Sequence, residues 1–318
     1  MADIALRSMQ VGIESTYGTG VAATREWYGE GKIQSSSSPA VMVNEDRGSY
    51  DAHHRATENV LEYEWEFAGG LDLDDVVEML QMAMDDGPAV TGAGPYVWTF
   101  TPSPALKSGT IEWDSSGQVW DLDGAMVDTF GLSGTANGED VTVELAGPGQ
   151  TRATSSLTSL SDHVTNVVQG WELKLYMDAL GATPGTTELT ATIISWDIEI
   201  TNSLTRKYKG DNSRYINGVS RGRRMLTGNI LCCLNASALT LLTNAEAVTE
   251  KLIRLELGNN VSAGGGNYYM YIDVPCVLSA NEIGEDEEET TVSFEFTSIY
   301  DATNTFAYEV TVQNSRAS

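Results

Sequence analysis

The sequence predicts a mainly β fold, arranged as two tandem β-sandwich or barrel domains that each carry one flanking α-helix and one long loop between strands. Three observations support this prediction. Apolar and polar residues alternate with a period of two along many segments, each half has one segment with helical spacing, and the halves resemble each other at an offset of about 163 residues. The length of 318 residues also fits two domains of ordinary size.

The internal repeat consists of three pairs of segments that occur in the same order in both halves. Val11–Gly20 aligns with Leu175–Thr187 so that Gly18 matches Gly181. The other two pairs are Glu66–Leu80 with Asn229–Thr243, and Phe130–Leu145 with Phe294–Val312. We therefore expect a first domain over residues 1–150, a linker over 151–165 and a second domain over 166–318, because duplicated units of this size fold as similar domains.

Strands are predicted wherever the alternation is regular. In Leu61–Phe67, the apolar side chains of Leu61, Tyr63, Trp65 and Phe67 share one face and three glutamates share the other. Further predicted strands are Tyr96–Phe100, Trp171–Leu175, Trp196–Ile200, Leu252–Leu257, Tyr268–Val274, Phe294–Phe296 and Tyr308–Val312, which are rich in aromatic or β-branched residues.

One helix is predicted in each half. Leu73–Met84 places its apolar residues three and four positions apart and carries acidic residues in its first turn, where the helix dipole favours them. In the second half Asn235 is a suitable N-cap for a helix through Leu239, Leu242 and Ala245.

Composition restricts the function. The net charge of −27 excludes a general nucleic-acid binder, because phosphate contacts require lysine and arginine. No apolar stretch is long enough to span a membrane, and the first residues lack a secretory signal, so we expect synthesis in a cytoplasm without membrane association. The three cysteines, Cys232, Cys233 and Cys276, form no metal or redox motif and are expected to be reduced.

Two polar loops are longer than most loops in compact domains, which indicates function or intermolecular contact. The first, residues 35–59 with the strand that follows it, is acidic, and the second, residues 202–221 with its flank, is basic. The acidic residues are Glu45, Asp46, Asp51, Glu58, Glu62, Glu64 and Glu66, beside Arg47 and Arg55. The basic residues are Arg206, Lys207, Lys209, Arg214, Arg221, Arg223 and Arg224, beside Asp211 alone. We expect the basic loop to dock on an acidic surface of another copy, and a plain solvated loop is the alternative.

The row formed by Glu62, Glu64 and Glu66 has two interpretations. It is either an ordinary solvated sheet face or the wall of a channel through which a polyanion passes. The corresponding positions of the second half, Met225, Thr227 and Asn229, carry no charge, which argues against a uniformly acidic wall.

Catalytic and metal motifs are weak. Gly218–Gly222 matches the G-x-S-x-G nucleophile motif around Ser220, but no strand precedes it and no helix follows it as that motif requires. His53 and His54 are adjacent and would point to opposite faces of a strand, and Glu285–Glu289 lacks the spacing of a calcium loop. We expect no catalysis, no cofactor and no bound metal.

The opening GIESTYGTGVAA (residues 12–23), the order strand, long loop, strand, helix, and the ending EVTVQNSR (residues 309–316) resemble the major tail tube proteins of long-tailed, siphovirus-type bacteriophages. The resemblance implies tail-tube-like β domains in a duplicated form. Family members form hexagonal rings that stack into a tube, with the long loop reaching the adjacent ring and an acidic lumen that lets DNA pass. Three duplicated chains would supply the six domains of one ring.

The resemblance also implies partners and a location. The partners are further copies of the chain, a tape-measure protein, and tail terminator and tail-tip proteins, with DNA as a transient, non-specific passenger during ejection. The location is the virion tail, after synthesis in the cytoplasm of the bacterial host. By position, the charged residues of the two loops are the candidates for ring stacking, and Glu62, Glu64 and Glu66 are the candidates for the lumen wall.

Three alternatives remain. A tandem β-sandwich adhesin or carbohydrate-binding surface protein would expose aromatic residues on a concave face. A hydrolase would depend on Ser220. A ring of the tail tip or of a contractile secretion tube would share the fold.

Overall fold

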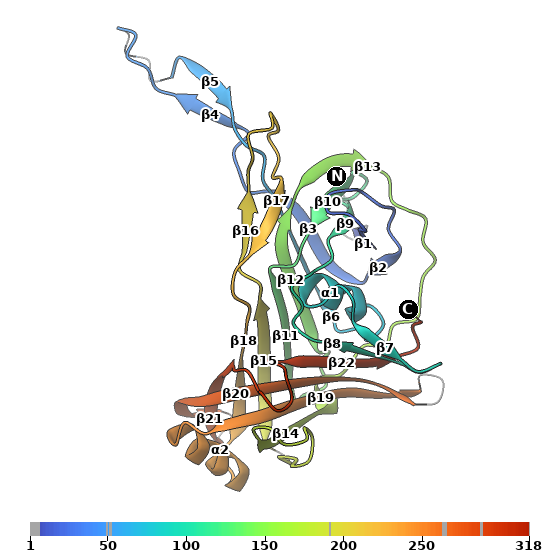
Figure 1. The fold of residues 1–318 in the computed structure, drawn as a ribbon, viewed down its shortest axis with the longest axis vertical. Coiled ribbons are helices and arrows are strands. Elements are labelled where there is room, and N and C mark those ends of the chain that lie inside the picture. Colours follow the sequence, from blue (N-terminus) through green and yellow to red (C-terminus); the bar gives the residue numbers. More distant parts are fainter. Residues whose placement is uncertain are drawn as a thin grey trace.

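Strands make up most of the computed structural model, which describes residues 7–48, 50, 53–190, 192–262, 266–286 and 289–317 (Figure 1). The strands of the first half are β1 (Ser8–Ile13), β2 (Arg25–Trp27), β3 (Gly29–Ser35), β4 (Ala40–Val43), β5 (Arg55–Glu58), β6 (Tyr63–Gly70), β7 (Ala89–Thr91), β8 (Tyr96–Phe100), β9 (Gly109–Asp114), β10 (Val119–Ala125), β11 (Thr129–Thr135), β12 (Thr142–Gly149) and β13 (Thr151–Ser155). Those of the second half are β14 (Leu173–Ala179), β15 (Ile193–Thr201), β16 (Leu204–Lys207), β17 (Gly218–Arg221), β18 (Met225–Cys233), β19 (Glu250–Ser262), β20 (Asn267–Asp286), β21 (Glu289–Ser298) and β22 (Glu309–Asn314). The predicted mainly β fold class is confirmed.

One antiparallel sheet contains strands of both halves. Its order is β3-β6-β12-β11-β15-β18-β21-β20, so each half contributes four neighbouring strands. The halves meet where β11 pairs with β15, from Thr129 opposite Thr201 to Thr135 opposite Ser195. We call this set the eight-stranded sheet and the β11–β15 contact the internal seam. Backbone hydrogen bonds therefore join the two halves into one continuous surface.

A second layer covers one face of the eight-stranded sheet in each half. In the first half it is β13-β10-β9-β1-β2. In the second half it is formed by β14, β19, the first part of β20, β22, β8 and β7. Strand β20 is 20 residues long and belongs to both layers, because it pairs with β19 and β22 through its first part and with β21 through its second part. Strand β8 comes from the first half but pairs with β22 of the second.

The core lies between the layers and contains the apolar side of the predicted alternation. Trp65 and Phe67 of β6, Ile198 of β15 and Phe294 of β21 are all at most 4% exposed. Their neighbours in sequence point to the opposite, open face of the eight-stranded sheet. The rings of Trp27 and Trp65 have centroids 6.3 Å apart and tie the two layers of the first half together.

Both predicted helices are present, as α1 (Val76–Ala83) and α2 (Ala236–Glu246). The Asn235 side chain accepts a hydrogen bond from the Ala238 amide at 3.0 Å, which confirms the predicted cap. Helix α1 is almost wholly buried, whereas α2 buries only Ala238, Leu241 and Ala245. No helix in the described part of the chain is long and apolar enough to cross a membrane.

Two of the three aligned pairs occupy similar places in the two halves. Gly18 and Gly181 both have positive φ angles, 69° and 76°, which glycine adopts without strain. In both halves the second aligned segment runs from a strand of the eight-stranded sheet into the helix. The third alignment is wrong, because residues 130–145 form the β11–β12 hairpin whereas residues 294–312 run from β21 to the distant β22. In the second half, the β20–β21 hairpin holds the place that the β11–β12 hairpin holds in the first. The extra length of β20 shifts the two halves out of alignment at this point of the sequence.

Residues 151–155 of the expected linker form β13, which pairs with β10 of the first half. The connection from residue 156 onwards then crosses to the second half and reaches β14 through the short 3-10 turn at Gly170–Glu172.

Candidate functional site

The direction of the strands gives the eight-stranded sheet two different rims. β6 runs from the long loop at Tyr63 towards α1, and β18 runs from the second loop at Met225 towards α2. β12, β11 and β15 lie between them and every pairing is antiparallel, so β6 and β18 point in the same direction. Both long loops therefore leave one rim, which we call the arm rim, and both helices follow the opposite rim, which we call the helix rim.

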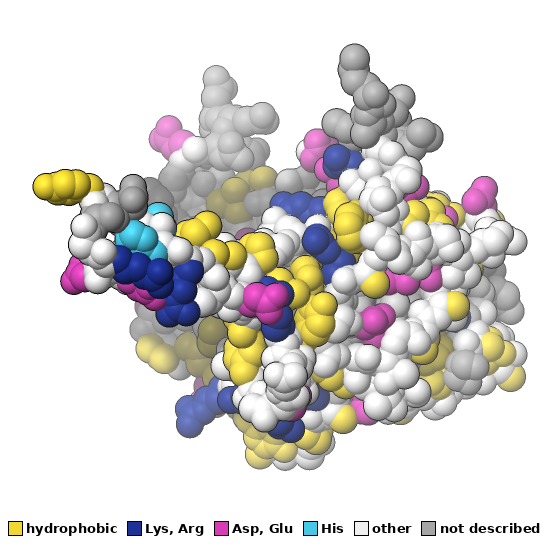
Figure 2. Space-filling view, turned by 90° about the horizontal axis from the view of Figure 1, so that it is seen from above, with side chains coloured by type: hydrophobic (Ala, Val, Ile, Leu, Met, Phe, Trp, Pro, Cys, Tyr) yellow, Lys and Arg dark blue, Asp and Glu magenta, His cyan; other side chains and the backbone are white. Residues whose placement is uncertain are grey.

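The first long loop, residues 36–62, projects from the arm rim as a β-hairpin of β4 and β5 (Figure 1). We call it the arm. Near its tip Glu45 pairs with both Arg47 and Arg55. Figure 2, which looks from the arm end, shows lysine or arginine and histidine side chains gathered on this projection. Asp46 lies on the same tip, and Asp51 lies outside the described residues.

The basic loop braces the base of the arm. The Arg214 guanidinium donates to the carbonyl oxygens of Asn59 at 2.7 Å and Pro39 at 2.8 Å, and it lies 3.5 Å from the Glu58 carboxylate. The Leu61 amide donates in return to the Arg214 carbonyl at 2.8 Å. One side chain of the second half thus holds both strands of the arm, a role that its charge alone did not indicate.

Other basic residues of this loop also bind within the chain. Arg206 pairs with Glu64 at 2.7 Å, and Tyr208 donates to Glu62. Burial and the Glu62 carboxylate raise the pKa of Tyr208 to about 12, so this phenol keeps its proton.

The remaining basic residues fall into two groups. Arg221 and Arg224 donate to the carbonyl oxygens of Pro104 and Met84. Lys207, Lys209 and Arg223 make no ion pair with any described residue, so they are the cations of this loop that are available to another molecule.

The open face of the eight-stranded sheet is acidic in both halves. Glu64 and Glu66 of β6 lie on this face, as the alternation of Leu61–Phe67 predicts, whereas Glu62 precedes β6 at the base of the arm, where Tyr208 donates to it. Five further acids share it and were missed as a group: Glu30 on β3, Glu144 on β12, Asp197 and Glu199 on β15, and Glu295 on β21. The second half therefore carries acids on β15 and β21 in place of the neutral row on β18.

Few cations offset these acids. Lys32 pairs with Glu66, and Arg206 pairs with Glu64 from the side of the sheet. On β18, Asn229 donates to the Asp197 carboxylate at 2.9 Å. Burial and the nearby Glu199 raise the pKa of Asp197, as expected where like charges lie close on one face.

The two outer edges of the eight-stranded sheet lack a partner within the described chain. One is β3, which pairs only with β6, and the other is the second part of β20, residues 278–286, which pairs only with β21. Leu132 of β11 and Ile283 of β20 occupy equivalent places, since each is the partner of a buried valine, Val143 or Val292. Leu132 is 3% exposed because the internal seam covers it, whereas Ile283 is 59% exposed.

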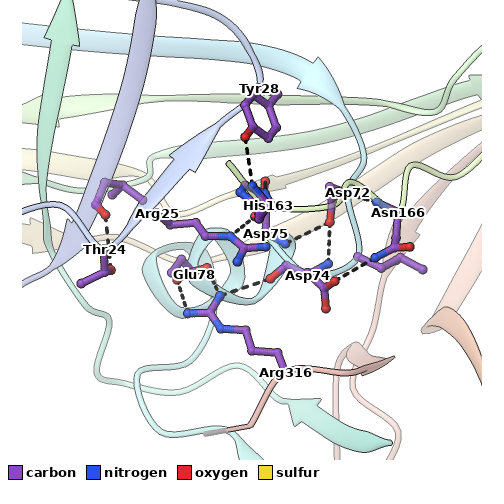
Figure 3. Close-up of polar contacts among 12 residues, drawn as sticks. Thr24, Arg25, Tyr28, Asp72, Asp74, Asp75, Glu78, His163, Asn166 and Arg316 are labelled. Atoms are coloured by element: carbon purple, nitrogen blue, oxygen red, sulfur yellow. Dashed lines mark hydrogen bonds and ion pairs between the residues drawn. The ribbon is translucent and has the colours of Figure 1, made fainter. Parts of the chain in front are cut away.

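A buried acidic cluster, which the sequence did not predict, ties the halves together at α1 (Figure 3). Asp72 accepts from the backbone amides of Asp74 at 2.7 Å and of Asn166, in the connection between the halves, also at 2.7 Å. Asp75 pairs with Arg25 and, at 3.1 Å, with His163. Because these groups already satisfy the two carboxylates, the arrangement is a structural tie and not an open metal site, although the ligand atoms of Asp72, Asp75 and His163 lie within 4.8 Å of one another.

The end of the chain joins the same cluster. Arg316 donates through both terminal nitrogens to Glu78 of α1, a carboxylate that is 1% exposed. The Asn314 side chain donates to the Leu73 carbonyl at 2.8 Å. Residues more than two hundred positions apart thereby fix α1 between the halves.

We expect Asp75→Asn to change the pH dependence of stability. Burial, reinforced by the Asp72 carboxylate, raises the pKa of Asp75 to about 6, although Arg25 and His163 lower it. The folded chain therefore holds this proton more tightly than the unfolded chain, and the stabilisation is complete below about pH 4 and lost as the pH rises through 6. Between pH 4 and 6.5 the unfolding free energy of the wild type should fall by up to about 3 kcal/mol through this titration. The variant lacks the titrating group, so its stability relative to the wild type should rise by the same amount. Urea denaturation of both proteins across this range measures the difference, and parallel curves would refute the assignment.

The opening motif GIESTYGTG is organised by one buried carboxylate. Glu14, which is 2% exposed, accepts hydrogen bonds from the amides of Gly18 and Gly124, both at 2.8 Å, from the Ser108 hydroxyl at 2.6 Å and from the Thr110 hydroxyl at 3.0 Å. In the second half Asp301 accepts from the amide of Gly181 at 2.9 Å. The residues of the motif therefore serve the fold.

The G-x-S-x-G match does not form a nucleophile elbow. Ser220 lies on β17 opposite Thr205 of β16, and β17 leads into another strand. A nucleophile elbow needs a sharp turn from a strand into a helix, so this serine lacks the geometry that activates such a residue.

The comparisons with known proteins agree with this architecture. A search of curated proteins found no match. The model of a family described as phage tail tube protein matches residues 5–298, which is nearly the whole chain. The chain therefore belongs to the phage tail tube protein family and is a structural component of the virion tail.

Proposed function

We propose that three copies of this chain close into a ring of six similar domains, and that such rings stack into the tail tube of a siphovirus-type phage through which DNA passes. The chain acts by self-assembly, without catalysis. Its other partners are a tape-measure protein inside the tube and the terminator and tip proteins at its ends.

The observation that carries the proposal is the pair of free edges on the eight-stranded sheet. Inside one chain β11 pairs with β15, and β20 and β3 hold the equivalent places at the two outer edges. Pairing β20 of one copy with β3 of the next repeats the internal seam between copies. Because the two edges differ, the contact is heterologous and closes only if a whole number of copies completes the circle.

The exposure of Ile283 supports the same contact. A large apolar side chain on the core-facing side of an edge strand gains stability only when a neighbour covers it. Ile33 of β3 faces the core in the same way, and it is 4% exposed. We expect the ring contact to bring these two positions together, as the internal seam brings Leu132 next to Ile198.

The acidic open face then becomes the wall of the lumen. A wall that carries Glu64, Glu66 and the acids of β12, β15 and β21 repels the phosphates of DNA, so the polyanion slides without binding. Acids in both halves would give all six domain positions this property.

Electron microscopy of the purified full-length chain tests the proposal. We expect rings and tubes with threefold symmetry in which six similar domains surround a central channel. A chain that stays monomeric at high concentration, or that forms rings with six copies, would contradict the proposed stoichiometry. A ring whose acidic sheet face points outward would contradict the role of the lumen wall.

A further inference from the structure

The large apolar side chains that remain exposed are concentrated at the two rims. Among the described residues thirteen such side chains are exposed. Those at the arm rim are Val41, Met42, Tyr50, Val60, Tyr208, Met225 and Tyr300; those at the helix rim are Tyr28, Val164, Trp171, Leu239 and Val248. The remaining one is Ile283 on the free edge. Exposed apolar groups confined to opposite ends of a subunit are typical of head-to-tail contacts.

The helix rim is hollowed around Trp171. Two cavities of about 190 and 340 Å³ share Trp171, Leu173 and Lys174 in their walls. Gly170 donates its amide to the Glu139 carbonyl at 2.8 Å, which places the Trp171 backbone beside the end of the internal seam. We call the joined cavities the tryptophan groove.

The walls of the tryptophan groove are suited to apolar side chains. Trp171 is 57% exposed, and the rings of Tyr269 and Tyr271 stack at 4.2 Å along the other wall. The Arg254 guanidinium, which pairs with Asp273, lies 4.6 Å from the Tyr271 ring centroid and helps to hold this aromatic wall in place.

We propose that the tryptophan groove receives the arm of a second copy in the adjacent ring, with Val41 and Met42 of β4 packed against Trp171. This inference rests on the proposed function and adds the receiving surface. The arm extends further from the sheets than the other described elements (Figure 1). The arm starts at the arm rim and the groove lies at the opposite, helix rim. A pair of stacked copies therefore still has one unoccupied arm at one end and one unoccupied groove at the other, so stacking continues without closing.

The length of the arm permits this contact. Met42 lies seven residues beyond the end of β3 at Ser35, which spans up to about 23 Å of extended chain. Arg214 braces the base of the arm, so the hairpin is held in place before it binds. Holding the arm in place lowers the entropy lost on docking.

Full-length Trp171→Ala tests the contact. We expect rings of normal size, but a concentration for tube growth that is about thirtyfold higher than for the wild type, because a central tryptophan in such a contact is worth about 2 kcal/mol. Leu239→Ala is the matched control, since Leu239 is 51% exposed on the same rim but outside the groove, and it should change that concentration by less than about threefold. Light scattering and electron microscopy measure both.

A disulfide trap identifies the partner. Under oxidation, the double variant Ala40→Cys, Lys174→Cys, which keeps Met42 and Trp171 and places one thiol beside each of them, should form covalent multimers only when assembled, and neither single variant should. Assembled tubes without the cross-link, Trp171→Ala tubes that grow at wild-type concentration, or a Leu239→Ala effect of equal size would overturn the inference while the ring stands. A wild-type chain that forms no rings would overturn the proposed function and this inference together.

Discussion

Replacing Ile283 with lysine is expected to abolish ring formation while the single chain stays folded. Ile283 is 59% exposed in one copy, so the substitution costs little in the monomer. In the proposed contact the lysine would be covered on the core side of the sheet, and burying an unpaired ammonium there costs at least about 3 kcal/mol at each of three contacts. That is about a hundredfold loss of association at each contact.

Sedimentation and electron microscopy measure the effect, and circular dichroism checks the fold. Tyr300→Lys is the control, because Tyr300 is an equally exposed apolar residue that lies away from the free edges. It should leave ring formation intact. Normal rings from Ile283→Lys would mean that β20 does not meet β3 of a neighbour, and rings lost in both variants would mean that any added charge prevents assembly.

Replacing Glu14 with alanine is expected to lower the free energy of unfolding by about 4 kcal/mol. The change removes the buried carboxylate that accepts four hydrogen bonds. Two backbone amides and two hydroxyls then lose their acceptor. Each buried donor left without an acceptor costs about 1–3 kcal/mol, and rotation of the two hydroxyls recovers part of the loss.

Urea denaturation measures this loss. Glu30→Ala is the matched control, because it removes an exposed glutamate from β3 and should change stability by less than about 0.5 kcal/mol. If Glu14→Ala cost less than about 1 kcal/mol, the carboxylate would not organise the opening motif.

Local patterns in the sequence were enough to predict the elements. The alternation of Leu61–Phe67 identified both the buried face and the acidic face of β6, and Asn235 identified the start of α2. Both predictions depend on neighbours within a few residues, which the sequence displays directly. Gly18 and Gly181 could be aligned for the same reason, because each forms a tight local turn.

Long-range partners could not be predicted in the same way. The alternation around Asp197 and Glu295 shows that these acids point away from the core, but only the order of strands places them on the same face as Glu64. Strand order depends on backbone pairing between distant segments, which no local pattern records. The dual pairing of β20 was hidden for this reason, and it caused the third repeat alignment to fail.

Charge was a weak guide to the second long loop. Its positive residues indicated contact with another molecule, yet Arg206 binds Glu64 of β6, Arg214 binds the arm of its own chain and Arg224 binds a backbone carbonyl. An arginine that donates to carbonyl oxygens has the same sequence signature as one that awaits an acidic partner. Lys207, Lys209 and Arg223 are accordingly the residues at which the expected electrostatic docking has to be tested.

The pairing of β8 with β22 has a consequence for synthesis. Tyr96–Phe100 leaves the ribosome about 210 residues before its partner Glu309–Asn314, a delay of roughly 10 to 40 s at ordinary elongation rates. Until residues 309–316 emerge, β8 has no neighbour on that side, and Arg316 has not yet bound α1. A nascent chain consequently cannot complete either half until Arg316 has left the ribosome, so both halves mature together.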